Sequence, residues 1–331
     1  MTARPDLTTR YLGLDLPSPI IAASCGLTKS VENIRRCAQA GAGAVVLKSL
    51  FEEQIGAEVN DLVEASRDSL WHPEAVEYVR AYGEADAVAK YLSLIREAKQ
   101  AVSIPIIASV HCVSATSWTD FARRIEEAGA DALELNVFVL PSNPLRSAAE
   151  NEQIYFDIVR EVKRRVSLPI ALKISHYFSS LAQTLQRLSR SGAAGLVLFN
   201  RFHRPDVDIE NLRMVAAPYF SHPHEIELPL RWVALASRFV ECDLAATTGI
   251  HDGAGAVKLL LAGATTVQVA STLYRNGIGQ IGVMLADLSD WMERHNYSTL
   301  EAFRGKLGHA GAQDAAAFER VQFMKMSVGV E

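Results

Sequence analysis

The sequence predicts a single-domain α/β protein folded as a (β/α)8 barrel, on the strength of two repeated phrases and the periodicity between them. A small-Gly-Ala phrase and a Pro-Ile phrase alternate along the chain, and each leads into a short apolar run. Eight such runs start near residues 19, 44, 105, 131, 169, 195, 243 and 266. The gaps carry helical spacing of apolar residues, as in Ile154, Ile158, Val159 and Val162. Eight buried parallel strands with a helix after each close into a barrel without open edges.

Each phrase has a local physical reason. Glycine tolerates the left-handed conformation that ends a helix, so the small-Gly-Ala phrase marks a close turn from a helix into a strand. Proline opens the other strands, where no ladder donor is needed. The small-Gly-Ala copies are Ala40-Gly41-Ala42, Ala128-Gly129-Ala130, Ser191-Gly192-Ala193 and Ala262-Gly263-Ala264; the Pro-Ile copies are Pro19-Ile20-Ile21, Pro105-Ile106-Ile107 and Pro169-Ile170-Ala171, with Val240 to Ala246 as a fourth run that lacks the proline.

A doubly wound open sheet is the alternative fold, but no Gly-x-Gly-x-x-Gly follows the first strand. We therefore expect residues 1–331 to form one barrel, with an inserted loop and helical region at about 51–103 over the active-site face. No linker or low-complexity segment interrupts the 331 residues.

The composition excludes several classes of function. The chain is 49% hydrophobic and 21% charged with a mean hydropathy of +0.08, which is enough apolar material for a large core. Its net charge is −5 without a basic run, so we expect neither nucleic acid nor an anionic membrane as a partner. No signal-like segment occupies the first residues, and the four cysteines lack metal-type spacing. These features predict a cytoplasmic protein without a bound metal.

Polar residues follow the apolar runs at the carboxyl ends of the strands, where barrels place their chemistry. Lysine and asparagine are poor strand residues and are seldom buried without a partner, so four of them at one rim indicate a site. In chain order the strand ends read Ser24-Cys25-Gly26, Lys48-Ser49, His111-Cys112, Asn136, Lys173, Asn200, Thr247-Thr248-Gly249 and Ala270-Ser271.

The last two strand ends suggest a phosphate site. Small residues there let backbone N–H groups approach a phosphate, as barrels often do after their last strands. Tight turning alone also explains small residues, but two lysines at the same rim favour a phosphorylated ligand.

At these positions the chain resembles the FMN-dependent dihydroorotate dehydrogenases, and the soluble class most of all. The resemblance covers nearly the whole chain. It is carried by Tyr11-Leu12-Gly13, Ser18-Pro19, Ala22-Ala23-Ser24, Lys48-Ser49, Glu134-Leu135-Asn136, Leu172-Lys173-Ile174, Thr247-Thr248-Gly249-Ile250, Leu260-Leu261-Ala262-Gly263-Ala264, Val267-Gln268-Val269 and Phe303-Arg304-Gly305-Lys306-Leu307.

The resemblance implies a flavoprotein oxidoreductase of pyrimidine biosynthesis and assigns roles to single residues. Lys173 would lie beside the N1–C2=O edge of the flavin, where a cation stabilises the reduced form. Lys48 and Asn136 would touch both flavin and substrate, and Asn200 would face the substrate. The other implied flavin contacts are Ala23, Ser24, Ser49 and Phe199, with Thr248, Gly249, Ala270 and Ser271 at the phosphate; the family usually has glycine at positions 248 and 270.

The substrate half departs from the family pattern. The family follows its asparagine with Ser-Cys-Pro-Asn, whose cysteine (serine in other classes) takes a proton from dihydroorotate. Here Val139 or Leu140 stands at the base position and cannot accept a proton. Ser142 and His111 are the replacement candidates, with Lys48 as the third catalytic residue. A structural role for His111 is the alternative.

Two further segments bear on the substrate. The family's pyrimidine-clamping loop is replaced by Asp61 to Gly83, which contains His72. Arg201 and Arg204 follow the sixth strand and suit a carboxylate-bearing substrate, unless they form a solvated loop.

These features predict an FMN-dependent oxidoreductase acting on CH–CH bonds of a small cyclic substrate, such as a dihydropyrimidine, with a second electron acceptor. The alternatives are a flavin enzyme for another small substrate, and an FMN-binding electron-transfer or regulatory protein without dihydroorotate activity. The oligomeric state stays open, with a homodimer as one candidate.

Overall fold

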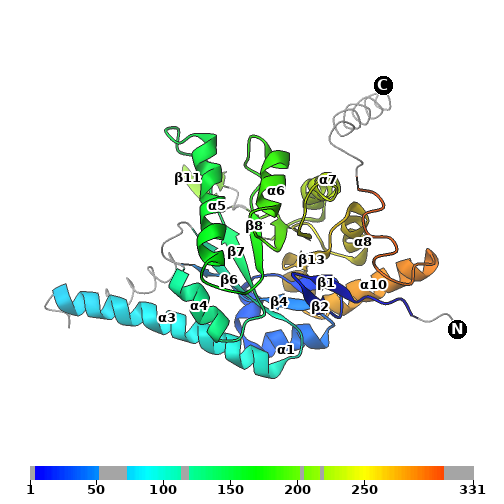
Figure 1. Cartoon of the computed structure of the whole chain (residues 1–331), viewed down its shortest axis with the longest axis horizontal. Helices are drawn as coiled ribbons and strands as arrows, with labels where there is room; N and C mark the ends of the chain where they lie inside the picture. The colour runs from blue at the N-terminus through cyan, green and yellow to red at the C-terminus, as the bar shows by residue number, and fades with distance from the viewer. Residues whose placement is uncertain (1–3, 52–72, 113–118, 202–204, 217–219, 309–331) are drawn as a thin grey trace.

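A closed barrel of eight parallel strands forms the body of the chain in a computed structural model that describes residues 4–51, 73–112, 119–201, 205–216 and 220–308 (Figure 1). The strands pair in the order β4-β3-β13-β12-β9-β8-β7-β6, and the pairing of β4 with β6 closes the ring. Every strand begins within one residue of its predicted start, which confirms the (β/α)8 prediction. The wall consists of β3 (Ile20–Ala22), β4 (Ala44–Val46), β6 (Ile106–Cys112), β7 (Ala132–Val137), β8 (Ile170–Ile174), β9 (Gly195–Leu198), β12 (Asp243–Thr247) and β13 (Thr266–Val269).

Helices follow the strands and cover the outside of the barrel (Figure 1). They are α1 (Val31–Gln39), α3 (Pro73–Ala101), α4 (Thr119–Glu127), α5 (Ala148–Lys163), α6 (Leu181–Ser189), α7 (Glu227–Ala236), α8 (Gly253–Ala262), α9 (Ser271–Asn276) and α10 (Gln280–Arg294), with short 3-10 turns η1 (Gly26–Lys29) and η3 (Pro223–Ile226). No helix within the described ranges is both long and apolar enough to cross a membrane.

The repeated phrases act as expected. The glycines of the four small-Gly-Ala copies have φ angles of 92°, 92°, 101° and 117°, which is the left-handed region that glycine adopts without strain. Each strand-opening proline uses its carbonyl oxygen instead of an N–H: the oxygen of Pro19 accepts from Val267, that of Pro105 from Val45, and that of Pro169 from Leu133. Proline therefore begins these strands without loss of a ladder hydrogen bond.

Two antiparallel hairpins fall outside the eight-strand prediction. The first, β1 (Thr9–Tyr11) with β2 (Leu14–Leu16), inserts Tyr11, Leu12 and Leu16 into the apolar end of the barrel interior. Complete burial of each such side chain contributes about 1.5–3 kcal/mol. Asp243 holds the hairpin in place, because its carboxylate accepts the N–H of Leu12 at 2.7 Å. The hairpin thus closes the amino-terminal mouth of the barrel.

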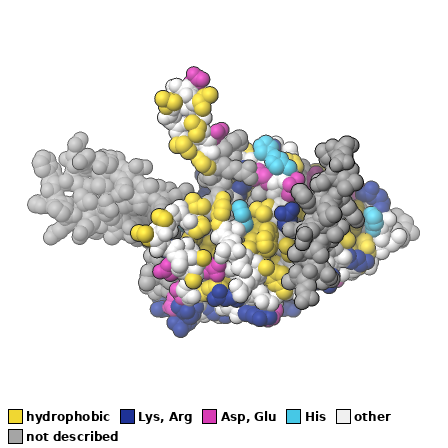
Figure 2. All heavy atoms as spheres, turned by 90° about the horizontal axis from the view of Figure 1, so that it is seen from above, with side chains coloured by type: hydrophobic (Ala, Val, Ile, Leu, Met, Phe, Trp, Pro, Cys, Tyr) yellow, Lys and Arg dark blue, Asp and Glu magenta, His cyan; other side chains and the backbone are white. Residues whose placement is uncertain are grey.

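The second hairpin, β10 (Pro205–Asp208) with β11 (Arg213–Ala216), follows β9. Figure 2 shows apolar side chains gathered on a projection that stands out from the molecule, and this hairpin carries the exposed Val207, Ile209, Leu212 and Met214.

The barrel interior changes from apolar to polar along its axis. Strand side chains alternate between the helices and the interior. At the amino-terminal level the inward residues are apolar, including Ile21, Val46, Ile107, Ala132 and Ala171. The next inward residues along β6, β7 and β8 are polar and buried, namely Ser109, Glu134 and Lys173, and the buried Gln268 of β13 lies at the same level. This polar layer lies below the carboxyl ends of the strands.

The barrel wall has one interruption, which a side chain fills. β4 pairs with β6 at Ile106 and Ile107, and the two-residue strand β5 (Leu50–Phe51) pairs with β6 at Val110 and His111. Between them the hydroxyl of Tyr91, on α3, accepts the N–H of Ser109 at 2.8 Å and donates to its carbonyl at 3.0 Å. Tyr91 therefore replaces the missing ladder contacts.

Part of the inserted region predicted at about 51–103 is described. Its helix α3 packs its last turns on the barrel through Tyr91, Leu92, Ile95 and Ala98, and its first turns project beyond the barrel (Figure 1, cyan). Residues 52–72 lie outside the described residues, so the position of this region over the active-site face stays a prediction.

Candidate active site

A cavity at the carboxyl ends of the strands brings together most of the predicted site residues. The predicted residues that line it are Ala23, Ser24, Asn136, Lys173, Phe199, Asn200, Thr248, Gly249, Ala270 and Ser271. The cavity measures about 200 Å³ and adjoins a second one of about 420 Å³, with which it shares Phe199, Asn200, Arg201 and Thr248. Together they fall within the roughly 300–1,000 Å³ typical of small-molecule sites.

Strand β12 ends in a backbone turn that faces this cavity. Thr248 and Gly249 have φ angles of 82° and 77°. A Cβ atom on Gly249 would lie 2.1 Å from the backbone nitrogen of Ile226, so only glycine fits there. Thr248 keeps a conformation that glycine prefers, at a cost of about 1–2 kcal/mol, and its hydroxyl donates to the carbonyl of Phe199 at 3.4 Å. The turn therefore retains a glycine-like backbone without glycine at position 248.

Two serines and a histidine stand beside this turn. The hydroxyl of Ser271, at the start of α9, accepts the N–H of Ser221 at 3.0 Å. The Ser221 hydroxyl lies 3.1 Å from Nε2 of His251. Burial lowers the pKa of His251, and the nearby Arg275 lowers it further. The end of the cavity next to β12 and β13 is thus rich in hydroxyl and backbone groups.

The Lys173 ammonium sits at the floor of the cavity within a buried polar group. It donates to Oε1 of Gln268 at 3.3 Å and lies 3.6 Å from Oε1 of Glu134. Gln268 in turn donates from Nε2 to Oε2 of Glu134 at 2.7 Å. Lys173 and Gln268 line the cavity, whereas Glu134 lies beneath it and is fully buried. A buried cation facing a cavity is suited to an electron-rich ligand edge.

Two asparagines have different roles in the geometry. The side-chain oxygen of Asn136 is buried and has no hydrogen-bond partner within the described part of the chain. Buried polar atoms are nearly always bonded, so this oxygen is available to a ligand. The side-chain nitrogen of Asn200 instead donates to the carbonyls of Val137 at 3.2 Å and Lys173 at 3.3 Å. Asn200 therefore joins the ends of β7 and β8 while it lines the cavity.

A chain of serine hydroxyls leads from the cavity into the barrel. Ser24 lines the cavity, and its hydroxyl lies 2.9 Å from that of Ser49, whose N–H it also accepts at 2.8 Å. Ser49 continues to Ser109, with 2.8 Å between their hydroxyls. The predicted residue Ser49 thus stands behind Ser24 and supports it.

Lys48 and His111 stand together beside an aromatic cluster on the β4–β6 side of the rim. The Lys48 ammonium lies 4.4 Å above the centre of the Phe51 ring, and burial lowers its pKa. His111 is buried and stacks on Phe51 with ring centres 4.8 Å apart, and Phe138 meets His111 edge-on at 5.9 Å. The wall on this side of the rim is therefore aromatic.

The loop after β7 carries the other candidate base. Val139 is half-buried, while Leu140 and Ser142 are exposed on the rim. Ser142 does not line the cavity with Asn136 and Lys173. Its role as a base stays a prediction, and so does that of His111.

Arg201 is paired within the protein. Its guanidinium contacts the buried carboxylate of Glu225, with Nε–Oε2 at 2.9 Å and Nη2–Oε1 at 3.3 Å. This pairing removes much of the charge that suggested a carboxylate-bearing substrate. Arg204 and His72 lie outside the described residues.

Sequence reasoning missed several residues that line the cavity, namely Phe220, Ser221, Ile250, Gln268, Val269 and Tyr274. Gln268 could have been predicted from the sequence, because a polar residue inside the apolar run Val267-Gln268-Val269 needs a buried partner. Ser221 and Tyr274 could not, since they come from loop and helix positions whose direction only the folded chain determines.

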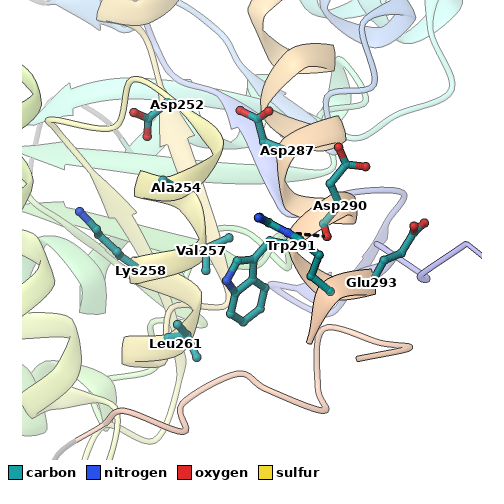
Figure 3. A pocket seen from close by; sticks show the side chains of 10 residues that line it. Asp252, Ala254, Val257, Lys258, Leu261, Asp287, Asp290, Trp291 and Glu293 are labelled. Atoms are coloured by element: carbon teal, nitrogen blue, oxygen red, sulfur yellow. Dashed lines mark hydrogen bonds between the residues drawn. The ribbon is translucent and has the colours of Figure 1, made fainter. Parts of the chain in front are cut away.

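A larger cavity of about 840 Å³ lies elsewhere, outside the barrel between α8 and α10 (Figure 3). Lys258, Trp291 and the acidic residues Asp287, Asp290 and Glu293 line it. None of the predicted site residues does, so we assign the chemistry to the smaller cavity at the strand ends.

The chain is similar in sequence to dihydroorotate and dihydropyrimidine dehydrogenases. A family model described as dihydroorotate dehydrogenase matches residues 6–292. The catalytic subunit of dihydroorotate dehydrogenase B (NAD(+)) from Thermoplasma volcanium is 27% identical over 91% of this chain and 98% of its own length. The chloroplastic dihydropyrimidine dehydrogenase (NADP(+)) of Arabidopsis thaliana is 23% identical over 92% of this chain and 77% of its own. A putative dihydroorotate dehydrogenase A (fumarate) from Aeropyrum pernix is 25% identical over 84% and 89%.

Proposed function

The chain belongs to the dihydroorotate dehydrogenase family, and from this premise we propose that it is an FMN-dependent oxidoreductase acting on a CH–CH bond of a small cyclic substrate. The observation that carries the proposal is one cavity at the strand ends lined by Lys173, Asn136, Thr248 and Gly249. These residues come from three different strand ends, which is how barrels assemble catalytic sites.

The donor set supports FMN as the cofactor. The buried oxygen of Asn136, which has no hydrogen-bond partner within the described residues, would accept a hydrogen bond from a flat heterocycle, and the Lys173 ammonium would suit the electron-rich edge of that ring. At the other end, the turn at Thr248 and Gly249, together with Ala270 and Ser271, offers backbone N–H groups without bulky side chains, which suits a phosphate.

FMN, when bound, supplies the hydride chemistry and passes the electrons to a second acceptor. The chain's own residues then bind and orient the reactants. Lys48 lies at the aromatic side of the rim with Phe51 and His111, where a planar ring can stack. Asn200, fixed by Val137 and Lys173, presents a rigid polar group to the substrate. Any proton taken from carbon needs an acceptor within hydrogen-bond reach.

That acceptor distinguishes this chain within its family. Val139 and Leu140 cannot accept a proton, so we propose that a dihydropyrimidine is oxidised slowly unless Ser142 or His111 substitutes. The aromatic cluster at Phe51, His111 and Phe138 supports a planar, less polar substrate in place of dihydroorotate. The relatives' names cite NAD(+), NADP(+) and fumarate, so the second acceptor varies among them.

The test starts from the purified protein. We expect a yellow protein with one FMN per chain, seen in its absorption spectrum and in the cofactor released on denaturation. A colourless protein that does not bind added FMN would overturn the proposal. A stopped-flow screen of dihydroorotate and dihydrouracil then measures flavin bleaching against dithionite, and we expect dihydroorotate to react far more slowly than dithionite.

The two candidate bases are tested in the same assay. Ser142→Ala or His111→Ala should lower any activity about 10²- to 10⁴-fold if that residue is the base. Ser93→Ala and His295→Ala are the matched controls, because Ser93 is exposed on α3 and His295 packs on Trp291 at the end of α10, both outside the barrel. Fast turnover that survives both changes would contradict this account and make His72 the next residue to test.

One alternative keeps the cofactor but not the enzyme activity. A protein that binds FMN and is reduced by no small substrate, yet exchanges electrons with a partner, would be an electron-transfer or regulatory protein. The substrate screen separates the two, since only the enzyme shows substrate-dependent bleaching.

A further inference from the structure

A buried carboxylate lies directly beneath the cation that faces the cavity. Glu134 is 0% exposed and Lys173 is 9% exposed, and their charged atoms are 3.6 Å apart. The distance exceeds that of a hydrogen bond, so the pair is held by Coulomb attraction in the buried interior of the barrel. The carboxylate therefore offsets part of the positive charge that Lys173 presents to the cavity.

Gln268 fixes both partners from the opposite side of the barrel. Its strand, β13, is separated from β8 by β12 and β9, so its side chain spans the interior to reach Lys173 and Glu134. The amide oxygen accepts from Lys173 and the amide nitrogen donates to Glu134, which is the only orientation that satisfies both groups. Gln268 thus keeps the ammonium and the carboxylate at a fixed separation.

Glu134 Oε1 interacts with Lys173 through charge and not through a hydrogen bond. This oxygen is buried with no hydrogen-bond partner within the described residues, and it lies 3.6 Å from the Lys173 ammonium. A buried carboxylate gains little stability from an ion pair compared with an apolar residue of the same size. A structural contact alone does not explain why a charge is kept at this position.

We propose that Glu134 and Gln268 are positioning residues that set how much of the Lys173 charge reaches the bound cofactor. This proposal rests on the proposed function, because it takes FMN as the occupant of the cavity. Glu134 offsets part of the positive charge of Lys173, and Gln268 fixes the position of the ammonium. Together they set the reduction potential of the cofactor bound in the cavity.

The test measures the midpoint potential of bound FMN in each variant at one fixed pH. Glu134→Gln removes the compensating charge with little change of shape, so the potential should rise. Lys173→Met removes the cation, so the potential should fall. We expect each change to alter the ratio of reduced to oxidised cofactor at least tenfold, about 30 mV for a two-electron couple. Glu241→Gln is the charge-matched control, because Glu241 is exposed and pairs with Arg190 just before β12.

An unchanged or lowered potential in Glu134→Gln, with full FMN occupancy, would overturn the proposal. A second measurement needs no cofactor: the thermal midpoints of Glu134→Gln, Lys173→Met and the double variant without FMN. Removal of one partner leaves the other charge buried without compensation, so we expect the double variant to be more stable than either single variant. Failure to bind FMN in the wild type would refute the proposed function alone, whereas additive midpoints would refute the pairing itself.

Discussion

Replacement of Tyr91 by phenylalanine should destabilise the barrel, although it removes only one oxygen atom. The hydroxyl serves both backbone groups of Ser109, with contacts of 2.8 and 3.0 Å, in the gap between β4 and β5. Tyr91→Phe leaves one N–H and one C=O buried without partners. Each unsatisfied group costs about 1–3 kcal/mol. We therefore expect the free energy of unfolding to fall by about 2–6 kcal/mol.

Thermal unfolding measures the loss, and hydrogen exchange locates it. The Ser109 amide should exchange much faster in the variant, because its acceptor is gone. Tyr297→Phe is the matched control, since within the described residues its hydroxyl accepts only from the exposed Lys306, and we expect a change below about 0.5 kcal/mol. Unchanged stability together with unchanged exchange at Ser109 would refute the account of Tyr91 as a substitute for ladder hydrogen bonds.

Three further predictions follow from single residues. Thr248→Gly should raise the free energy of unfolding by about 1 kcal/mol and leave FMN binding intact, as thermal melts and FMN titration would show; lower stability would mean that the φ of 82° is not strained. Tyr11→Phe should not destabilise, because the buried hydroxyl lacks a partner in the described residues. Burial raises the pKa of Tyr11, so the folded wild type keeps its stability below pH ~10 and loses stability as the pH rises above that. At pH 11 the Tyr11→Phe variant should therefore melt at a higher temperature than the wild type. An equal drop in melting temperature for both proteins at alkaline pH would contradict this. Maleimide should label Cys25, which lines the cavity, more slowly once FMN is bound, whereas Cys37 should stay unlabelled because burial raises its pKa to about 12; labelling of Cys25 that ignores FMN would count against the cavity as the cofactor site.

The barrel was predictable because its signals are local. A strand that begins after Pro19, Pro105 or Pro169 depends on one residue and its apolar successors, and such signals repeat with each βα unit. The hairpin of β1 and β2 could not be predicted in the same way. The hairpin stabilises the fold through Tyr11 and Leu16, which fill a space that exists only after the barrel has closed.

In the site, too, the residues with a local signal were predictable and their partners were not. Lys173 and Asn136 were found from the sequence because polar residues directly after apolar runs are unusual. The partners of those residues were not found, since Gln268 meets Lys173 from across the barrel and the two are 95 positions apart. Arg201 shows the limit most plainly. Its sequence position suggested a free cation, and the fold pairs it with Glu225.

The two ends of the described chain are fastened to each other. Asp6 forms a bridge with Thr299, and Arg304 donates to the hydroxyl of Thr9 at 2.6 Å. The hairpin that seals the barrel is therefore synthesised before the barrel strands but gains its last contacts only when residues near 300 have emerged from the ribosome. The same proximity makes the described part of the chain a candidate for circular permutation: a linker joining its two ends, with new termini opened in a rim loop, would leave every strand neighbour unchanged.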